Sequence, residues 1–497
     1  MDLNLITHWE PRPGRVVEWK VSDADARSAA QAPIAPAPPT TMQERHLRRA
    51  RLAANNNEAQ SPWIGIAFDF PGKLDADAMA RALRRYVERH DTLHSWFSFA
   101  DPAGDPTDKS NAIRRHVVAP EHFELTVVDG PELTTPVQVR EHVGARFANE
   151  TSALGWPAYV FGAIEHTVSP GDADSGIPEQ AEGFTLFHAI DHAHTDMQSM
   201  ILMFAEIRIS YQAEIDGTTP ELPDPGSYVE YSARERERAA SLTLESPEVQ
   251  GWLGYLARTG GSFPGFPLDL GVSDGPAPAI GSRFDLADAD ECEQFGAVCK
   301  ANGSNFIGGV FAALAITEHE LAGRDRYLAL SPLTTRGETN FWSQGWFINL
   351  VPVAVELDGA RTFTDIAAAA QQAYRDGKTL GDVSVQQVIE TVLAQAPAIA
   401  AAAPTALTPP PILSYIDGRR LPQTESYVST KATGLVGGKD TQIASIWVNR
   451  VLEGTWMAIS HPDTDTAHAS VAAYAGRVSE IMKAVAHEGD YQIGSAG

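Results

Sequence analysis

The chain has 497 residues, which exceeds the about 250–300 residues at which a single hydrophobic core usually stops growing, so two lobes are expected. Its 43% hydrophobic and 21% charged residues are typical of a globular protein. A net charge of −26 argues against nucleic acid or an anionic membrane surface as the main partner, because both are bound by clustered basic side chains. The N-terminus lacks a signal-peptide pattern and no stretch approaches the about 20 apolar residues of a membrane span, so we expect a cytoplasmic protein.

The first half of the chain mixes helix and strand patterns after an Ala- and Pro-rich lead-in at 28–39. These patterns predict helices at 40–57 and from 74 towards a strand ending near 98, and further strands at 61–72, 113–118, 123–128 and 157–166. An acidic, Gly-rich hairpin loop is expected at 168–183, before a strand that carries a histidine cluster. Behind this cluster a helix is predicted, because apolar residues recur at helical spacing at Met200, Phe204, Ile207 and Tyr211.

The second half begins after a Pro-, Glu- and Arg-rich segment at 214–245, which we interpret as the link between two α/β lobes at 1–215 and 216–497. Helices are predicted at 287–301, 304–320, 362–378, 383–395 and 465–487, and strands at 327–332 and 346–356. The low-complexity stretch 394–411 is expected to be a surface loop. Cys292 and Cys299 lie about two helical turns apart, beyond disulfide reach, so both are expected to be buried thiols.

The segment "LFHAIDHAHTDM" at 186–197 holds three of the fifteen histidines within seven positions. If the strand continues through it, His188, Ile190, His192 and His194 share one face, because side chains alternate along a strand. This concentration of imidazole groups has three interpretations: a metal site, structural groups at a sheet edge, or a general base.

A metal site is suggested because His192, His194 and Asp196 match the His-x-His-x-Asp ligand pattern of metallo-β-lactamase-like hydrolases. That pattern has a further His directly after the Asp, where this chain has Met197, and it needs distant ligands for which the sequence offers no clear candidate. A purely structural role at a sheet edge would explain a single His well, but it explains three histidines in one short segment less well. A general base is favoured because an imidazole with an ordinary pKa near 6.5 can remove a proton from a hydroxyl or amine at neutral pH. Asp196 would then shape the loop as a helix N-cap or as the partner of an arginine.

The His-x-x-x-Asp pattern also resembles the His-His-x-x-x-Asp-Gly motif of the chloramphenicol-acetyltransferase-like fold, which includes peptide-synthetase condensation domains and free-standing acyltransferases. Other stretches agree in order and spacing: "TTMQERHL" through Gln43 and Arg45, "VERHDTLHSWF" at 87–97, "QGWFINLVPV" through Gly345, Phe347 and Asn349, and "GDVSVQQVIE". Within this superfamily the chain most resembles polyketide-associated acyltransferases that esterify trehalose glycolipids, in "AAQAPI", "LTLESPEVQGW", "GSFPGFPLDLG" and "NFIGGVFAALAITEHEL". The resemblance covers about residues 40–485.

Two positions depart from the family motif. Its first His is Asp191 here, and its terminal Gly is Met197. The second His, which the resemblance identifies as the base, is retained as His192. We expect the departure at Met197 to tune the substrate rather than to remove activity.

The resemblance implies two acetyltransferase-like lobes in a V, with a central tunnel and His192 near its middle. An acyl thioester of CoA, or of an acyl carrier protein within a polyketide synthase, would enter from one side and the acceptor from the other. No permanently bound cofactor and no metal is implied. Nε2 of His192 would take the acceptor proton, and Asp196 would be structural, paired with Arg336. His188, His194 and Met197 are possible channel-lining residues, whereas Trp346 and Asn349 are expected to be core and sheet residues.

The implied function is transfer of an acyl group from a thioester to a hydroxyl group of a sugar such as trehalose, in glycolipid assembly. An alternative is a free-standing condensation enzyme that forms an ester or amide in nonribosomal peptide or polyketide natural-product biosynthesis. A third is a non-catalytic scaffold, against which the retention of His192 and Asp196 argues. Because two related lobes already imitate a dimer, a monomer is expected.

Overall fold

The computed structural model describes residues 2–58, 63–119, 123–167, 182–258, 265–273, 275–395 and 412–494. The chain forms two compact units, each built around a β-sheet. The first unit comprises Met1–Glu237, Arg336–Phe347 and Leu421–Gly438, and the second comprises Arg238–Thr335, Ile348–Arg420 and Lys439–Gly497. The loops expected at 168–183 and 394–411 lie almost entirely outside the described residues.

The units differ from the expected lobes at 1–215 and 216–497, because the chain passes between them several times. The expected boundary falls in the last turn of helix α5 (Met197–Asp216), whereas the first unit continues to Glu237 and includes two later segments. One of these segments contributes strand β13 (Thr433–Val436), which pairs with two N-terminal strands. A division at a single position cannot account for such a strand.

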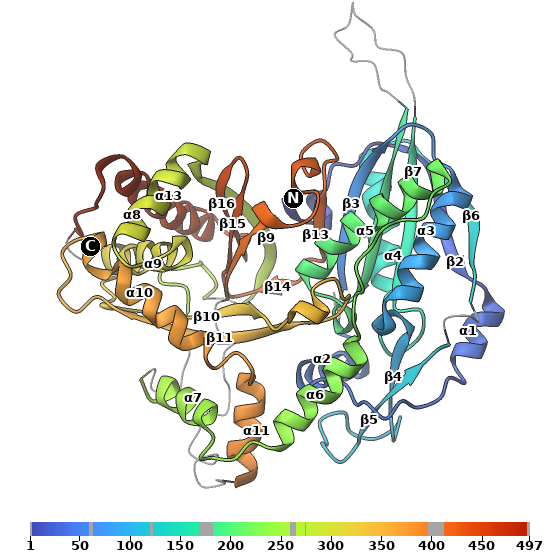
Figure 1. The fold of residues 1–497 in the computed structure, drawn as a ribbon, viewed down its shortest axis with the longest axis horizontal. Coiled ribbons are helices and arrows are strands. Elements are labelled where there is room, and N and C mark those ends of the chain that lie inside the picture. The colour runs from blue at the N-terminus through green and yellow to red at the C-terminus, as the bar shows by residue number, and fades with distance from the viewer. Residues whose placement is uncertain are drawn as a thin grey trace, which may run out of the picture. The chain divides into compact units, whose positions relative to one another are not determined.

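The sheet of the first unit has seven strands in the order β1-β13-β3-β8-β7-β2-β6 (Figure 1). Besides β13 these are β1 (Asp2–Leu5), β2 (Gly14–Val21), β3 (Trp63–Pro71), β6 (Leu125–Leu133), β7 (Tyr159–His166) and β8 (Gly183–Asp191). Neighbouring strands run antiparallel except β1 and β13, which are parallel. Strand β8 lies between β3 and β7, so the strand with the histidine cluster is paired on both edges.

Helices cover both faces of this sheet. Helices α3 (Ala76–Arg89) and α5 share one core with Phe68, Phe184 and Leu186, whereas α4 (Pro136–Glu150) packs on the opposite face against Phe187 and Ala189. The alternation of β8 side chains between the two cores follows from the period of two in a strand. The unit also contains α1 (Asp23–Ala29), α2 (Thr41–Asn55), β4 (Ser95–Phe99), β5 (Ile113–Val117) and most of α6 (Tyr228–Ala240).

The second unit has a five-stranded sheet in the order β12-β15-β16-β9-β14 and a two-stranded sheet of β10 and β11. The strands are β9 (Ala277–Asp288), β10 (Arg326–Thr334), β11 (Ile348–Glu356), β12 (Leu413–Asp417), β14 (Asp440–Thr441), β15 (Ser445–Val451) and β16 (Gly454–Pro462). Its main core is formed with α8 (Ala289–Ala301), α9 (Phe306–Ala322), α10 (Phe363–Lys378) and α13 (Asp465–Glu488). Helices α7 (Pro247–Arg258) and α11 (Val385–Gln395) pack together around Trp252.

Most predicted elements are confirmed, within two or three residues at their ends for the long helices. Cys292 and Cys299 are free and buried in α8, as expected. The segment interpreted as a link contains α6, which the sequence pattern did not predict. Other elements that were not predicted are α1, α4, α7, β1, β2, β9, β12, β13, β14, β15 and β16.

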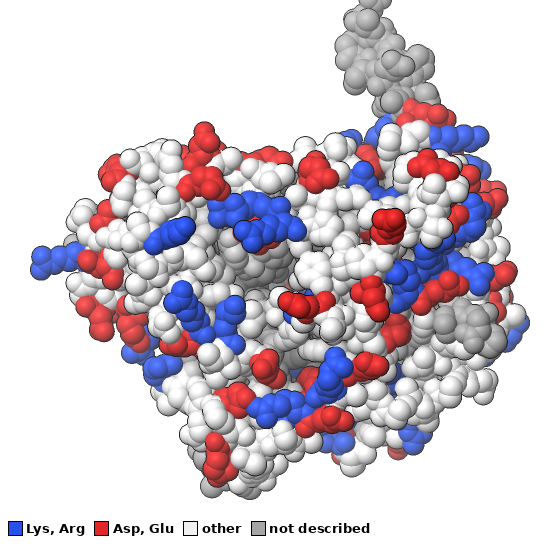
Figure 2. Space-filling model, viewed as in Figure 1, with Lys and Arg blue, Asp and Glu red and all other residues white. Residues whose placement is uncertain are grey.

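The surface carries both signs of charge. On the face drawn in Figure 2, Lys and Arg side chains are interspersed with Asp and Glu side chains, with white surface between them. In the described part of the chain no helix is both long enough and apolar enough to cross a membrane.

Candidate active site

The histidine cluster lies where β8 ends and α5 begins. The strand stops at Asp191, and His192–His194 form one turn of 3-10 helix. Oδ1 of Asp191 accepts a hydrogen bond from the backbone N–H of Ala193 at 2.8 Å, in the way an Asp side chain caps a helix. The prediction that the histidines share one strand face is therefore wrong beyond Asp191, because this side chain stabilises a turn in place of the strand.

Two of the three imidazoles are packed in the interior. His188 donates from Nδ1 to the carbonyl oxygen of Val160 at 3.0 Å, and its ring stacks on Phe161 with 4.6 Å between centroids. Nδ1 of His194 lies 3.0 Å from the hydroxyl oxygen of Thr92. Both histidines are 0% exposed, and burial lowers the pKa of His188 to about 3 and that of His194 to about 4. Neighbouring side chains enclose both rings, and a place beside a substrate channel stays a prediction for these two residues.

His192 differs from its neighbours because its side chain is half-buried. Its Nδ1 atom is enclosed and has no hydrogen-bond partner among the described residues. Burial, followed by the charge of His46, lowers the pKa of His192 to about 4, although its own peptide group, Asp196 and Asp191 act in the opposite direction. The ring is therefore neutral at pH 7 and able to accept a proton.

Asp196 opens helix α5 and fixes its first turn. Its Oδ1 accepts from the backbone N–H of Ser199 at 2.7 Å, the usual contact of an N-cap. Its Oδ2 accepts from Nη1 of Arg336 at 2.7 Å and from the backbone N–H of Phe347 at 2.9 Å. The side chains of Asp196 and Arg336 are 2% and 1% exposed, so this is a buried ion pair in which several donors satisfy the carboxylate. The structure thus joins the two residues that the sequence paired.

The segment that contains Arg336 also covers the histidine turn. Nε2 of Gln344 donates to the hydroxyl oxygen of Thr195 at 2.7 Å. The ring of Trp346 lies 4.0 Å from that of His192, between centroids. The residue between Gln344 and Trp346 must be a glycine, because a Cβ atom at Gly345 would overlap the ring of Tyr228. Trp346 was expected to be a core residue, but it forms one wall beside the imidazole.

Helix α2 supports the turn from another side. Gln43 donates from Nε2 to the carbonyl oxygen of Ala193 at 2.5 Å, and its Oε1 accepts from Arg115 and from the backbone N–H of Thr40, each at 3.0 Å. Of the two family positions matched in this helix, Gln43 therefore contacts the site, whereas Arg45 is exposed.

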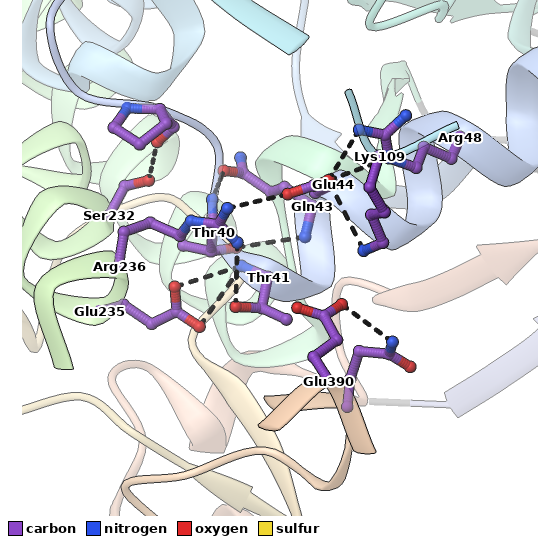
Figure 3. Close-up of polar contacts among 12 residues, drawn as sticks. Thr40, Thr41, Gln43, Glu44, Arg48, Lys109, Ser232, Glu235, Arg236 and Glu390 are labelled. Carbon is purple, nitrogen blue, oxygen red and sulfur yellow. Dashed lines mark hydrogen bonds and ion pairs between the residues drawn. The ribbon is translucent and has the colours of Figure 1, made fainter. Parts of the chain in front are cut away.

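The start of α2 is in turn tied to α6. Figure 3 shows Thr41 bonded to Glu235, and Glu44 close to Arg48, Lys109 and Arg236. This network holds in place the helix that carries Gln43.

His46 on α2 also reaches the site, although no motif in the sequence indicates it. Nε2 of His46 lies 2.9 Å from Oδ1 of Asp191, and the ring centroids of His46 and His192 are 6.2 Å apart. The two partners of the His46–Asp191 pair are separated by 145 positions in the sequence. Spacing within a motif cannot predict such a contact, and the one available signal was the His in "TTMQERHL" itself.

Met197 occupies the first position of α5 and is partly buried. A Cβ atom added to Gly434 on β13 would meet its Sδ and Cε atoms at 3.4 and 3.3 Å, so the Met side chain lies over this glycine. A channel-lining role for Met197 stays a prediction. Asn349 lies in β11, where it donates to the carbonyl oxygen of Gly381 at 2.7 Å.

The metal interpretation does not fit the positions of its ligands. His194 is stacked against Phe97 and enclosed, and both oxygens of Asp196 are bonded to protein donors. Among the described residues, no three His, Cys, Asp or Glu side chains gather in a way that could hold a metal ion.

Comparisons with a family model and with a solved structure show the class of protein to which this chain belongs. A family model described as "Condensation domain" matches residues 176–396, which include His192, Asp196 and Arg336. The structure titled "PapA2 acyl transferase" superimposes with a TM-score of 0.84 and 29% identity, over 98% of this chain and 100% of that chain. The two sheet-based units thus form a mixed α/β condensation-domain fold, which confirms the expected fold class; the V shape and the tunnel stay predictions.

Two curated relatives define the family. "Acyltransferase PapA3" of Mycobacterium tuberculosis (strain CDC 1551 / Oshkosh) is 31% identical over 502 residues, 99% of this chain and 98% of its own length. "Trehalose-2-sulfate acyltransferase PapA2" of the same strain is 30% identical over 492 residues, 96% of each chain. The chain belongs to the Pap-type acyltransferases, and it is an enzyme of the condensation-domain class, as the resemblance implied.

Proposed function

We propose that this enzyme transfers an acyl group from a thioester to a hydroxyl group of a trehalose-type sugar, with His192 as general base. The observation that supports this most is the difference between three imidazoles in one short segment. His188 and His194 are enclosed and bonded, whereas His192 is half-buried with Nδ1 enclosed. Nε2 of His192 is then the ring nitrogen left for an incoming O–H group.

In the proposed reaction the acceptor oxygen attacks the carbonyl carbon of the thioester while Nε2 of His192 takes the hydroxyl proton. The C–S bond then breaks, and the imidazolium returns the proton to the thiolate. The products are an ester and a free thiol, and His192 is regenerated. Proton transfer of this kind is worth about 10²–10⁴ in rate. Because a low pKa makes His192 a weak base, much of the remaining acceleration must come from holding the two substrates in line.

Asp196 and Arg336 act through the shape of the turn in this proposal. Their buried ion pair joins the start of α5 to the segment that carries Trp346. Both oxygens of Asp196 accept from other donors, and within the described residues neither is bonded to the ring of His192. Asp196 is therefore a positioning residue and not a proton acceptor.

The acceptor is proposed from the names of two relatives. PapA2 is named a trehalose-2-sulfate acyltransferase, and a further relative, PapA1 of the same strain, is named a 2'-acyl-2-O-sulfo-trehalose (hydroxy)phthioceranyltransferase. A disaccharide acceptor is consistent with both names. The donor is proposed to be a thioester of CoA or of an acyl carrier protein, with no permanently bound cofactor. A tunnel between two lobes, a monomeric state and a cytoplasmic location also stay predictions.

A condensation enzyme that forms an ester or amide in natural-product assembly is the second candidate. The observation that favours it is the condensation-domain match at 176–396, which covers the proposed base. It differs from the first candidate in its acceptor, so one experiment separates them.

The experiment incubates the purified protein with palmitoyl-CoA or palmitoyl-pantetheine, together with trehalose, trehalose 2-sulfate or phenethylamine, and identifies products by mass spectrometry. We expect a palmitoyl ester of a sugar from the wild type and none from His192→Ala. His142→Ala, which removes a histidine of α4, serves as the control and should keep wild-type activity. Amide as the main product supports the second candidate, and absence of both products from folded protein contradicts acyl transfer from these thioesters.

A further inference from the structure

Asp191 stands at the motif position where the family has its first His, and the structure gives this acid its own set of donors. Oδ1 accepts from Nε2 of His46 at 2.9 Å and from the backbone N–H of Ala193 at 2.8 Å, and Oδ2 accepts from the backbone N–H of Ala153 at 3.3 Å. The Asp191 side chain is 4% exposed. His46 and the hydrogen bond from Ala193 hold the pKa of Asp191 below its ordinary value although burial alone would raise it. Asp191 is therefore a buried anion.

A His side chain at position 191 could not replace this anion. A neutral imidazole offers a single acceptor nitrogen, whereas three donors from α2, the turn and the segment before β7 converge on the two oxygens of Asp191. His46 is therefore one of the three donors that satisfy the acid at this departure from the motif.

His46 lies beside the proposed base as well as beside Asp191. Its ring centroid is 6.2 Å from that of His192 and 5.6 Å from that of Trp346, against which it makes an edge contact. The rings of His46, Trp346 and His192 therefore form one cluster on the open side of the turn. The His46 side chain is 16% exposed, so it lies at the border of the packed interior.

We propose that His46 is a positioning residue for His192: bound to Asp191, it fixes the turn and, when protonated, places a positive charge beside the base. This inference rests on the proposed function for its catalytic meaning, but its electrostatic part can be measured without a substrate. His46 does not exchange a proton with the substrate in this account. It sets the geometry and the charge around the residue that does.

The direction of the electrostatic effect follows from the charges around His192. A protonated His46 on α2 disfavours a second positive charge on His192, whereas Asp191 at the end of β8 and Asp196 at the start of α5 favour it. The charge of Asp196 is balanced by Arg336, and Asp191 pairs with His46, whose ring is charged only when it is protonated. Removing the charge of His46 therefore raises the pKa of His192, both directly and by leaving Asp191 uncompensated. At a separation of 6.2 Å we expect a rise of about one pH unit.

The test uses three variants and nuclear magnetic resonance of histidine-labelled protein. His46→Gln keeps a hydrogen-bond donor for Asp191 but has no charge, and His46→Lys restores a permanent charge. His142→Gln is the matched control, since Nε2 of His142 on α4 lies 3.3 Å from a carboxylate oxygen of Glu18. The His192 signal is assigned by its disappearance in His192→Gln, and its titration midpoint is measured in each protein.

We expect the His192 midpoint to rise by about one pH unit in His46→Gln, to return towards the wild-type value in His46→Lys and to be unchanged in His142→Gln. The acid limb of the rate with palmitoyl-CoA and trehalose should move to higher pH in His46→Gln by the same amount. A lowered melting temperature in His46→Gln with an unchanged His192 midpoint would overturn the proposal, because a role in packing alone predicts that result. If the midpoints move as expected but no variant and no wild type acylates the sugar, the proposed function fails and the charge effect of His46 stands.

Discussion

Each unit contains a buried carboxylate that binds an arginine and backbone from a distant part of the chain. In the first unit Asp196 pairs with Arg336 and accepts from Phe347. In the second unit Glu320 on α9 pairs with Arg477 and accepts from the backbone N–H of Gly494 at 2.6 Å. The two acids do the same structural work, because each fastens a remote segment to the start or end of a helix.

The difference lies in what stands next to each acid. The half-buried imidazole of His192, which has a low pKa, lies four positions before Asp196 in the sequence. The side chains bonded to Glu320 are instead those of Arg477 and Tyr491. A buried ion pair is therefore weak evidence of catalysis by itself, since the second unit contains the same arrangement without an imidazole bonded to its acid. What distinguishes the first unit is an imidazole that its neighbours leave accessible.

The largest expected effect concerns that imidazole. His192→Ala should lower the rate of acyl transfer by about 10²–10⁴, because it removes the group that takes the acceptor proton. The melting temperature should stay within experimental error of the wild type, since the side chain is half-buried and Nδ1 makes no hydrogen bond within the described residues. Initial rates and differential scanning calorimetry check the two parts. A His192→Ala protein that keeps the wild-type rate contradicts the base assignment.

Asp196→Ala should reduce both stability and rate. It leaves the guanidinium of Arg336 buried without its carboxylate, which typically costs about 3–5 kcal/mol of unfolding free energy. Chemical denaturation measures this loss. If the rate falls while the unfolding free energy is unchanged, then Asp196 takes part in the chemistry and its role as a positioning residue is wrong.

Glu320→Ala sharpens the comparison between the two acids. It should cost about 1–3 kcal/mol, less than Asp196→Ala, because Arg477 is partly exposed and can be hydrated after the change. The rate per folded molecule should equal that of the wild type. A large loss of rate in folded Glu320→Ala protein would show that the second acid is not purely structural.

The enclosed histidines predict a pH dependence of stability. The folded-state pKa of His194 is about 4, below its ordinary value near 6.5, so the unfolded chain binds more protons as the pH falls below about 6.5. The contribution of the neutral His194 ring to the unfolding free energy is fully present above that pH and is lost as the pH falls towards the folded-state pKa. The loss amounts to about 2 kcal/mol at pH 5. His194→Gln should therefore show a smaller drop in melting temperature between pH 7 and pH 5 than the wild type, and an equal drop contradicts the neutral, buried state.

Much of the fold could be predicted because strong apolar periodicity survives in the long elements. Met200, Phe204, Ile207 and Tyr211 are all buried in α5, as their spacing predicts. Helix α6 was missed because only Tyr228 and Ser232 of its side chains are buried, so its sequence carries little periodic signal. In such a helix the tertiary contacts, and not the pattern, decide the structure.

The site was predictable only where one short segment contains it. The pairing of Asp196 with Arg336 followed from two family motifs, and the contact is present. By contrast, strand alternation predicted one common environment for His188, His192 and His194. The strand ends at Asp191, however, and the turn that follows places His192 and His194 off the strand face that carries His188. His46 and Trp346 lie far from the motif in sequence, so their contacts with the His192 turn arise from packing that no local pattern contains.

Strand β13 has a consequence for how the chain reaches its native state. Thr433–Val436 sit between β1 and β3, so the sheet beneath the histidine turn has a gap until the ribosome has delivered nearly nine-tenths of the protein. The N-terminal unit therefore cannot complete itself during early synthesis. Its sheet is complete only after the parts of the second unit at Arg238–Thr335 and Ile348–Arg420 have been synthesised.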